Sequence, residues 1–250
     1  SPSCIHPVIC SNLSTDHTAM TELYKKVDEH PKVKKAFVGS GIRYDLLVDD
    51  LNKGDDTKSH DEYIEQVITR HVSGRLKVAP EHTSDATLKL MRKPSFKYFH
   101  SFKEKYDKLS KKHGLNQPLI PYFISSHPGC EEQDMANLAV ETKDMGFQLE
   151  QVQDFTPTPM TVATVIYYAG VHPYTLRPTF TAKTKDEKQA QHRFFFWYKR
   201  ENQNWIRERM KKAKRPELAE ALLGKDTPQG KREVPKWLAE KRKKQNKKRR

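Results

Sequence analysis

Residues 76–85 of the chain, Leu-Lys-Val-Ala-Pro-Glu-His-Thr-Ser-Asp, join a short apolar run to a polar turn and the start of a helix. The apolar run has the length of a strand, and the Ser and Asp at its far end are favourable helix caps. Strand, turn and helix in this order form one βα unit. The same order occurs four times between residues 33 and 161, and the turns cover residues 39–43, 80–83, 126–129 and 155–159.

The spacing of these units predicts a parallel sheet or barrel. The expected strands begin near residues 34, 75, 118 and 149, so about 30 to 40 residues separate them, which suits helix-containing right-handed crossovers. Prolines at Pro118 and Pro121 indicate that the third strand lies at an edge or an open barrel margin. Since parallel strands end on one side, we expect the chemistry on the four turns.

Hydrophobic periodicity predicts the helices between these strands. Expected helices cover residues 16–30, 44–51, 63–71, 84–91, 96–109 and 135–145, with Asp16 or Thr15 as a cap for the first and a polar loop at 52–59. One face of the expected helix at 96–109 is an aromatic stripe, which we interpret as core. It consists of Phe96, Phe99, Phe102, Tyr106 and Leu109.

The pattern changes after Thr161. Residues 162–168 and 171–174 flank Ala169-Gly170 and are expected to form a hairpin, followed by a long helix at 188–211 and a short one at 216–223. The predicted parts are a lead-in with a helix (1–32), the barrel part (33–165), a C-terminal mixed helical extension (166–226) and a disordered basic tail (227–250). Aromatic side chains at 194–198 should pack the extension onto the barrel, with base stacking as the alternative.

The charge is concentrated at the C-terminus. Residues 231–250 contain eleven Lys or Arg and two Glu, a net charge of +9, which leaves +5 of the total +14 for the rest of the chain. Such a tail attracts nucleic acid through phosphates without sequence specificity, or is simply solvated. The sequence shows no apolar stretch near 20 residues and no signal peptide, so we expect no membrane span and a cytoplasmic location.

The chain has three cysteines, Cys4, Cys10 and Cys130, too few for a disulfide scaffold. Cys4 and Cys10 are candidate metal ligands together with His6, but they lack the usual short zinc or cluster spacing, and two ordinary thiols are the preferred interpretation. No metal ligand is therefore assigned.

Two turns carry chemically capable side chains. Glu81, His82 and Thr83 supply a carboxylate, an imidazole and a hydroxyl that suit ligand binding or proton exchange, although this turn also makes a helix cap. Residues 125–134 contain His127-Pro128-Gly129, followed by acidic residues that suit a helix N-terminus. Each turn alone is also compatible with a plain βα loop.

Read together, these turns resemble those of radical SAM enzymes. Residues 80–93 are similar to a Glu-Ser-Gly-Ser-Asp…Leu-Lys-Leu-Met-Asn-Arg segment, 124–135 to Gly-Phe-Pro-Gly-Glu-Thr-Glu-Glu-Asp-Phe, and 155–161 to Tyr-Ser-Pro-Arg-Pro-Gly-Thr. The chain most closely resembles the C-terminal part of the YgiQ family. The matching stretches are residues 5–18, 40–46, 76–83, 119–129, 151–155 and 167–170.

The resemblance implies an α/β fold: the later strands of a partial parallel (β/α) barrel that binds S-adenosyl-L-methionine (SAM) above a [4Fe–4S] cluster. It further implies an unknown substrate and an electron donor such as flavodoxin or ferredoxin. Radical chemistry would begin with reductive cleavage of SAM. The residues that the resemblance places near SAM or substrate are Arg43, Glu81, His82, Thr83, Ser126, His127, Phe155, Thr156 and Pro157.

One difference between this sequence and radical SAM enzymes affects the expected activity. The Cys-x3-Cys-x2-Cys triplet of radical SAM enzymes is absent from this sequence, so the chain alone is not expected to hold the cluster. The first hypothesis is a C-terminal portion of such an enzyme, with the cluster bound upstream. The alternative is a non-catalytic barrel remnant that binds RNA or a ribosomal partner through residues 231–250.

Overall fold

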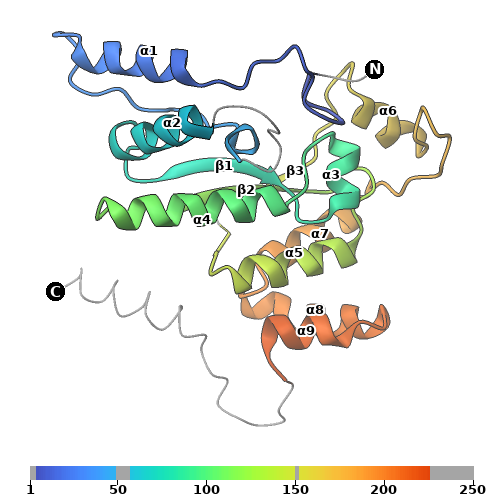
Figure 1. The fold of residues 1–250 in the computed structure, drawn as a ribbon. Coiled ribbons are helices and arrows are strands. Elements are labelled where there is room, and N and C mark those ends of the chain that lie inside the picture. The colour runs from blue at the N-terminus through green and yellow to red at the C-terminus, as the bar shows by residue number, and fades with distance from the viewer. Residues whose placement is uncertain (1–3, 49–56, 150–151, 226–250) are drawn as a thin grey trace, which may run out of the picture.

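The fold is built on a small parallel sheet, seen in a computed structural model that describes residues 4–48, 57–149 and 152–225. Its strands are β1 (Leu76–Glu81), β2 (Leu119–Ser125) and β3 (Val152–Asp154), in the order β1-β2-β3 (Figure 1). Both neighbouring pairs are parallel, with Leu76 opposite Leu119 and Phe123 opposite Val152. The protein is therefore an α/β protein with sequentially ordered parallel strands.

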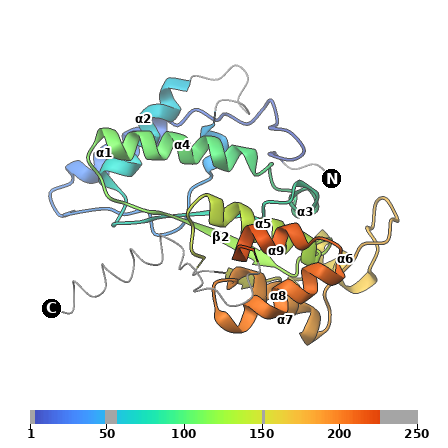
Figure 2. The same ribbon diagram turned by 90° about the horizontal axis from the view of Figure 1, so that it is seen from below.

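Helices connect the strands as the spacing predicts. α3 (Asp85–Met91) and α4 (Lys97–Lys112) lie between β1 and β2, and α5 (Glu132–Asp144) lies between β2 and β3. Ahead of the sheet come α1 (Thr18–Glu29), the 3₁₀ helix η1 (Tyr44–Leu47) and α2 (Thr57–Arg70). Figure 2 shows α1, α2 and α4 grouped on one side, and the C-terminal helices grouped on the other.

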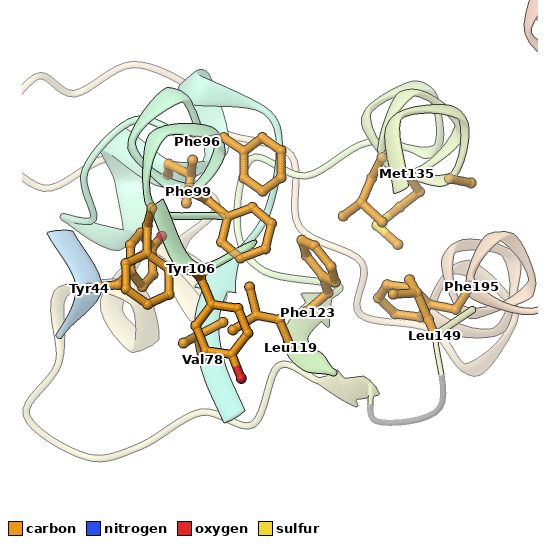
Figure 3. Close-up of a cluster of buried hydrophobic side chains, with 14 of the residues drawn as sticks. Tyr44, Val78, Phe96, Phe99, Tyr106, Leu119, Phe123, Met135, Leu149 and Phe195 are labelled. Atoms are coloured by element: carbon orange, nitrogen blue, oxygen red, sulfur yellow. The ribbon is translucent and has the colours of Figure 1, made fainter. Parts of the chain in front are cut away.

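One face of the sheet is buried against the helices. Along β2 the burial alternates, with Leu119 and Phe123 buried and Ile124 less so, as expected when a strand has one covered face. The predicted aromatic stripe of α4 lies on this face, and Phe99 and Phe102 are fully buried. Figure 3 shows Phe123 between this aromatic group and a second group around Met135.

The C-terminal extension consists of α6 (Val162–Ala169), α7 (Lys185–Phe195), α8 (Arg200–Lys212) and α9 (Pro216–Leu223). α7 packs against α5, β2 and β3, and α9 packs against α5 and α8. Phe194 and Phe195 are fully buried and Trp197 is 5% exposed, all three within the same hydrophobic cluster as the sheet. These three side chains therefore join the core, as predicted, whereas Phe196 and Tyr198 are partly buried and pack against it.

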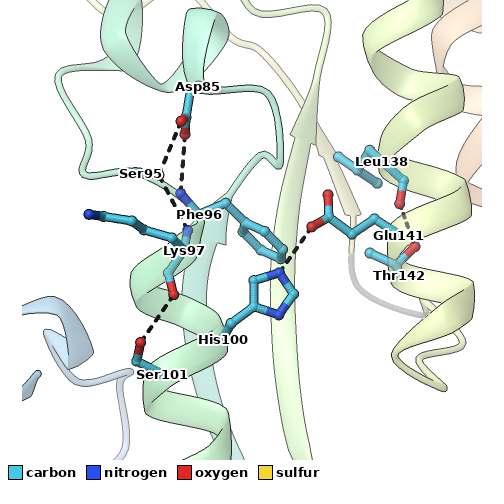
Figure 4. A network of polar contacts seen from close by, with 9 residues as sticks. All are labelled: Asp85, Ser95, Phe96, Lys97, His100, Ser101, Leu138, Glu141 and Thr142. Carbon is cyan, nitrogen blue, oxygen red and sulfur yellow. Dashed lines mark hydrogen bonds and ion pairs between the residues drawn. The ribbon is translucent and has the colours of Figure 1, made fainter.

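Polar contacts hold the crossover helices in place (Figure 4). Asp85 at the start of α3 accepts hydrogen bonds from the Ser95 hydroxyl at 3.1 Å and the Phe96 amide at 3.4 Å. His100 on α4 and Glu141 on α5 are 3.0 Å apart. α3 is thereby fixed against the start of α4, and α4 against α5.

The expected strand near residue 34 is wrong. Residues 34–39 have no regular secondary structure and pair with no strand in the described part of the chain. Their backbone bonds to the end of α2 instead: the Val38 amide donates to the His71 carbonyl, and the His71 Nδ1 lies 2.9 Å from the Ala36 carbonyl. The next residues approach β1 closely, since a Cβ on Gly41 would lie 2.9 Å from the Lys77 carbonyl oxygen.

The expectation for the proline-containing strand needs correction as well. β2 is the central strand, not an edge. In the described residues, however, β3 pairs only with residues 123–125 of β2. Pro121 lies before that stretch and is opposite Val78 of β1, so among the described residues its missing N–H interrupts no pairing with β3.

The extension departs from the sequence prediction at two places. The expected hairpin at 162–174 is wrong, because Val162–Ala169 is helical: the Thr161 side chain caps its first turn and Gly170 ends it at a φ of 66°. Val171 forms an isolated antiparallel bridge with Pro178, which lies outside both predicted segments. The expected helix at 188–211 is two helices, separated by residues 196–199.

Most of the expected helices agree with the structure. α1, α3, α4, α5 and α9 form at the predicted places, whereas α2 begins at Thr57, so residues 57–59 of the expected loop are helical. The cap of α1 is His17 rather than Asp16 or Thr15, although Asp16 accepts from the Thr18 amide at 2.9 Å. The polar loop at 52–59 and the basic tail fall mainly outside the described residues. No helix in the described residues has the length and apolar character that crossing a bilayer requires.

Candidate functional site at the carboxyl ends of the strands

A cleft of about 620 Å³ opens at the carboxyl ends of the three strands. Glu81 ends β1, Ile124 and His127 come from the end of β2, and Asp154 and Phe155 come from the end of β3. The other lining residues are Leu90, Met91, Arg92, Lys93, Gln153, Thr156, Thr158, Met160, Thr161, Val162 and Ala163. A second cleft, of about 550 Å³, lies at the opposite strand ends around Gln117 and carries none of the predicted site residues.

Two residues at the strand ends have left-handed backbones without being glycine. Glu81 has a φ of 69° and Ser126 a φ of 62°. This conformation costs an ordinary residue about 1–2 kcal/mol, so it persists only where the surroundings impose it. For Glu81 the carboxylate lies 3.3 Å from the Lys93 ammonium, which holds it at the edge of the cleft.

His82 is fully buried behind the cleft, and its hydrogen bonds define its tautomer. Its Nδ1 accepts from the Ser84 amide at 2.9 Å, so the proton is on Nε2. Nε2 lies 3.4 Å from the Cys130 sulfur and donates to it. Burial raises the pKa of the Cys130 thiol, so the pair is neutral and links the first turn to the second.

His127 connects the second turn to the third. It is 5% exposed, its Nδ1 donates to the Pro128 carbonyl at 2.9 Å, and its ring meets Phe155 edge to face at 5.0 Å. Burial lowers the pKa of His127 to about 4, and burial followed by the nearby His127 lowers the pKa of His82 to about 3. Both imidazoles are neutral at pH 7.

Because these two histidines are buried and neutral, we predict that the stability of the folded state depends on pH. In the unfolded chain each has a pKa near 6.5, so below that pH the unfolded state binds protons that the folded state does not. Stability is therefore full above about pH 6.5 and falls as the pH drops toward the folded pKa values. NMR should show two imidazoles that stay neutral down to pH 5, assigned by loss of their signals in His82→Gln and His127→Gln. Titration of either near pH 6.5 would contradict this arrangement.

Helix α7 supports the site with residues that the sequence did not indicate. Gln191, 1% exposed, accepts from the Ser126 amide at 2.7 Å and donates to the Cys130 carbonyl at 2.6 Å. His192 lies 3.2 Å from an Asp154 oxygen that also accepts from the Ser125 hydroxyl. The His192 hydrogen bond is the main cause that lowers the pKa of Asp154. The extension therefore holds the ends of β2 and β3.

The structure brings only part of the predicted set into one cleft. Glu81, His127, Phe155 and Thr156 line it together. Arg43 pairs with Asp45 and lines a separate cavity of about 40 Å³. His82, Thr83, Ser126 and Pro157 lie in the same turns without lining the cleft, and the buried Ser126 hydroxyl has no hydrogen-bond partner among the described residues. The lining residues Lys93 and Asp154 were missed.

The described residues contain no group of three His, Cys, Asp or Glu side chains that could hold a metal ion. Cys4 is exposed, Cys10 is partly buried, and Cys130 is buried against His82. The three cysteines of the chain thus do not form a cluster-binding set within the described residues.

Comparison with known proteins identifies relatives of this chain. Residues 150–250 match a family model described as "Domain of unknown function (DUF3362)". Proteins named "UPF0313 protein" from Porphyromonas gingivalis and Bacteroides thetaiotaomicron are 55% and 56% identical to it. Both alignments cover 90% of this chain and 36% of the relative. One from Methanosarcina acetivorans is 40% identical over 86% of this chain and 28% of its own length.

The chain is therefore homologous to UPF0313 proteins, and UPF0313 is the YgiQ-type family that the sequence resemblance names. It spans about a third of the length of the curated relatives that it matches.

Proposed function

We propose that this chain is the C-terminal part of a radical SAM iron–sulfur enzyme of the YgiQ type, and that the cleft at the strand ends binds SAM beside the substrate. One observation carries the proposal: Glu81, His127, Phe155 and Thr156 come from three separate turns and line a single cleft. The sequential parallel order β1-β2-β3 supports it, because an arc of a βα barrel requires that order.

The cleft fits SAM in its chemistry. Glu81 offers a carboxylate for the ammonium group of SAM, and Lys93 offers a cation for its carboxylate. Phe155, held between the His127 and Tyr167 rings, gives an apolar wall for the adenine, and Thr156 adds a hydroxyl. When bound, SAM and a [4Fe–4S] cluster supply the radical, while the chain's own residues bind and orient.

The cluster itself does not fit the described residues, which gather no ligand set for it. In this proposal the cluster is held by a part of the protein outside this sequence, in line with relatives about two and a half times as long. No catalytic step is therefore assigned to the residues of this chain. The alternative RNA-binding remnant rests on residues 231–250, outside the described part, and stays a prediction.

SAM binding to the complete protein tests the proposal. In Glu81→Gln we expect the SAM dissociation constant to rise about tenfold, equivalent to about 1.4 kcal/mol, because a charge-assisted hydrogen bond is lost while the size of the side chain is kept. Isothermal titration with the cluster assembled under anaerobic conditions measures it.

Glu104→Gln is the matched control, since Glu104 is an exposed carboxylate on α4 that pairs with Lys108 and lies away from the cleft. The same SAM affinity in both variants would remove Glu81 from the site. A complete protein that binds no SAM would overturn the proposal.

A further inference from the structure

A third cleft, of about 860 Å³, lies between α3 and residues 172–180 of the extension. It shares Leu90, Arg92 and Val162 with the cleft at the strand ends, so the two are continuous. Residues of α3 and Val162 of α6 both line it, and Figure 1 shows these two helices at the same end of the molecule. The other lining residues are His6, Pro7, Ala86, Lys89, Gly129, Glu131, His172, Tyr174, Thr175, Arg177, Pro178, Thr179 and Phe180.

This third cleft is positively charged. Lys89, Arg92 and Arg177 line it, and within the described residues neither Lys89 nor Arg177 has a carboxylate partner. The acidic residue in the lining, Glu131, accepts from the Asp134 amide in the capping box of α5. His6 also lines the cleft, and after burial the charges of Arg92 and Lys89 lower its pKa.

The third cleft also offers an aromatic surface. Tyr174 is 64% exposed, and the Arg92 guanidinium lies 5.9 Å from its ring centre. Phe180, 42% exposed, adds a second ring. A guanidinium near a tyrosine ring with an exposed face is an arrangement in which a planar base stacks well.

The loop that carries these groups is fixed by backbone hydrogen bonds. The His172 amide donates to the Arg177 carbonyl at 2.9 Å, and the Thr179 amide to the Gly170 carbonyl at 2.8 Å. The Gly129 amide donates to the Phe180 carbonyl at 2.7 Å and so joins the loop to the turn after β2. His172 Nδ1 accepts from the Tyr174 and Thr175 amides. The cations and the ring are thus pre-positioned, which reduces the ordering cost of binding.

We infer that the third cleft binds a nucleotide, with the phosphate held by Lys89 and Arg177 and the base stacked on Tyr174. A nucleotide satisfies both features together, because it combines a phosphate with a planar ring, whereas an acidic peptide needs only the charge. The nucleotide is either free or the end of a single-stranded nucleic acid. The inference goes beyond the proposed radical chemistry and does not depend on SAM, which has no phosphate.

Titration calorimetry on the full chain, without SAM or cluster, tests the inference with four probes: AMP, adenosine, ribose 5-phosphate and a four-nucleotide RNA. We expect AMP to bind at least tenfold more tightly than adenosine or ribose 5-phosphate. Tighter binding of the RNA than of AMP identifies a single strand as the source, and equal or weaker binding a free nucleotide. Both outcomes support a nucleotide site, and they remain informative if SAM binding fails.

Substitutions of residues that line the third cleft test whether AMP binds there. Arg177→Gln, Lys89→Gln and Tyr174→Ala should each weaken AMP binding about tenfold, in the range measured for single stacking or phosphate contacts. Arg200→Gln and Tyr168→Ala are matched controls, since both residues are exposed and neither lines the cleft. All variants keep residues 231–250 unchanged, so any AMP binding by the tail is the same in each and cancels in the comparison.

The inference would be overturned if neither AMP nor RNA bound at millimolar concentration, or if adenosine bound as tightly as AMP. Equal losses of AMP affinity in the cleft variants and the control variants would also overturn it. Equal competition by an acidic peptide of glutamates would also overturn it, since only charge would then be recognised. Circular dichroism of each variant confirms that its fold is retained.

Discussion

Phe99→Ala is expected to lower the free energy of unfolding by about 3–5 kcal/mol, the range for removing a buried phenyl ring from a close-packed core. Phe99 is fully buried, and its ring centre lies 5.1 Å from Phe96, 5.8 Å from Tyr44 and 6.0 Å from Phe147 (Figure 3). These rings come from three segments, so the cavity cannot close by the movement of one helix. Urea denaturation followed by far-UV circular dichroism measures the loss.

Phe37→Ala is the matched control, because Phe37 is 49% exposed and lies outside the core cluster. It should cost less than about 1 kcal/mol, since about half of the side chain is already in water and it fills no close-packed site. Similar losses at both positions would mean that the stripe on α4 does not form the centre of the core.

Phe99 also shows why much of the fold is predictable from the sequence. Aromatic residues at positions 96, 99, 102 and 106 recur at helical spacing, and only burial of one helix face satisfies that pattern. The helix ends are equally local: the Ser84 side chain caps α3, and Gly146 follows α5 with a φ of 78°. Local chemistry of this kind is readable without knowing the tertiary structure.

The secondary-structure predictions are wrong where a contact distant in sequence, or a helix cap, decides the structure. Residues 34–39 have the composition of a strand, but their amides and carbonyls find partners at His71, more than thirty residues away. Val162–Ala169 is rich in residues that also favour strands, and the Thr161 cap together with Gly170 decides for a helix. Strand propensity is a weak guide when capping competes with it.

The candidate site was likewise predictable from the sequence in part only. The turns after β1, β2 and β3 were predictable, because parallel strands end on one side. The sequence did not show which of their side chains face the cleft. His82 contacts Cys130 instead, and Lys93, twelve residues after Glu81, forms an ion pair with Glu81. Gln191 lies 65 residues from Ser126, and no spacing rule connects a helix residue to a turn that far away.

Gln191→Met is expected to lower the free energy of unfolding by about 2–4 kcal/mol, because two buried backbone groups lose their partners at about 1–3 kcal/mol each. The Ser126 amide and the Cys130 carbonyl both bond to the Gln191 side chain, and methionine keeps its length without its polar atoms. The left-handed backbone of Ser126 also loses the contact that helps to hold it. Urea denaturation measures the cost, as for Phe99.

Gln189→Met tests whether the effect belongs to the contact, since Gln189 lies two residues earlier on α7 and is exposed. It should change stability by less than about 0.5 kcal/mol. Because Gln191 fixes the turn that carries His127, its replacement should also weaken ligand binding in the cleft at the strand ends, whereas Gln189→Met should not. Equal stability of the two variants would show that the turn at 126–130 holds its shape without the Gln191 contact, and His192 with Asp154 would then be the polar contact left between α7 and the site among the described residues.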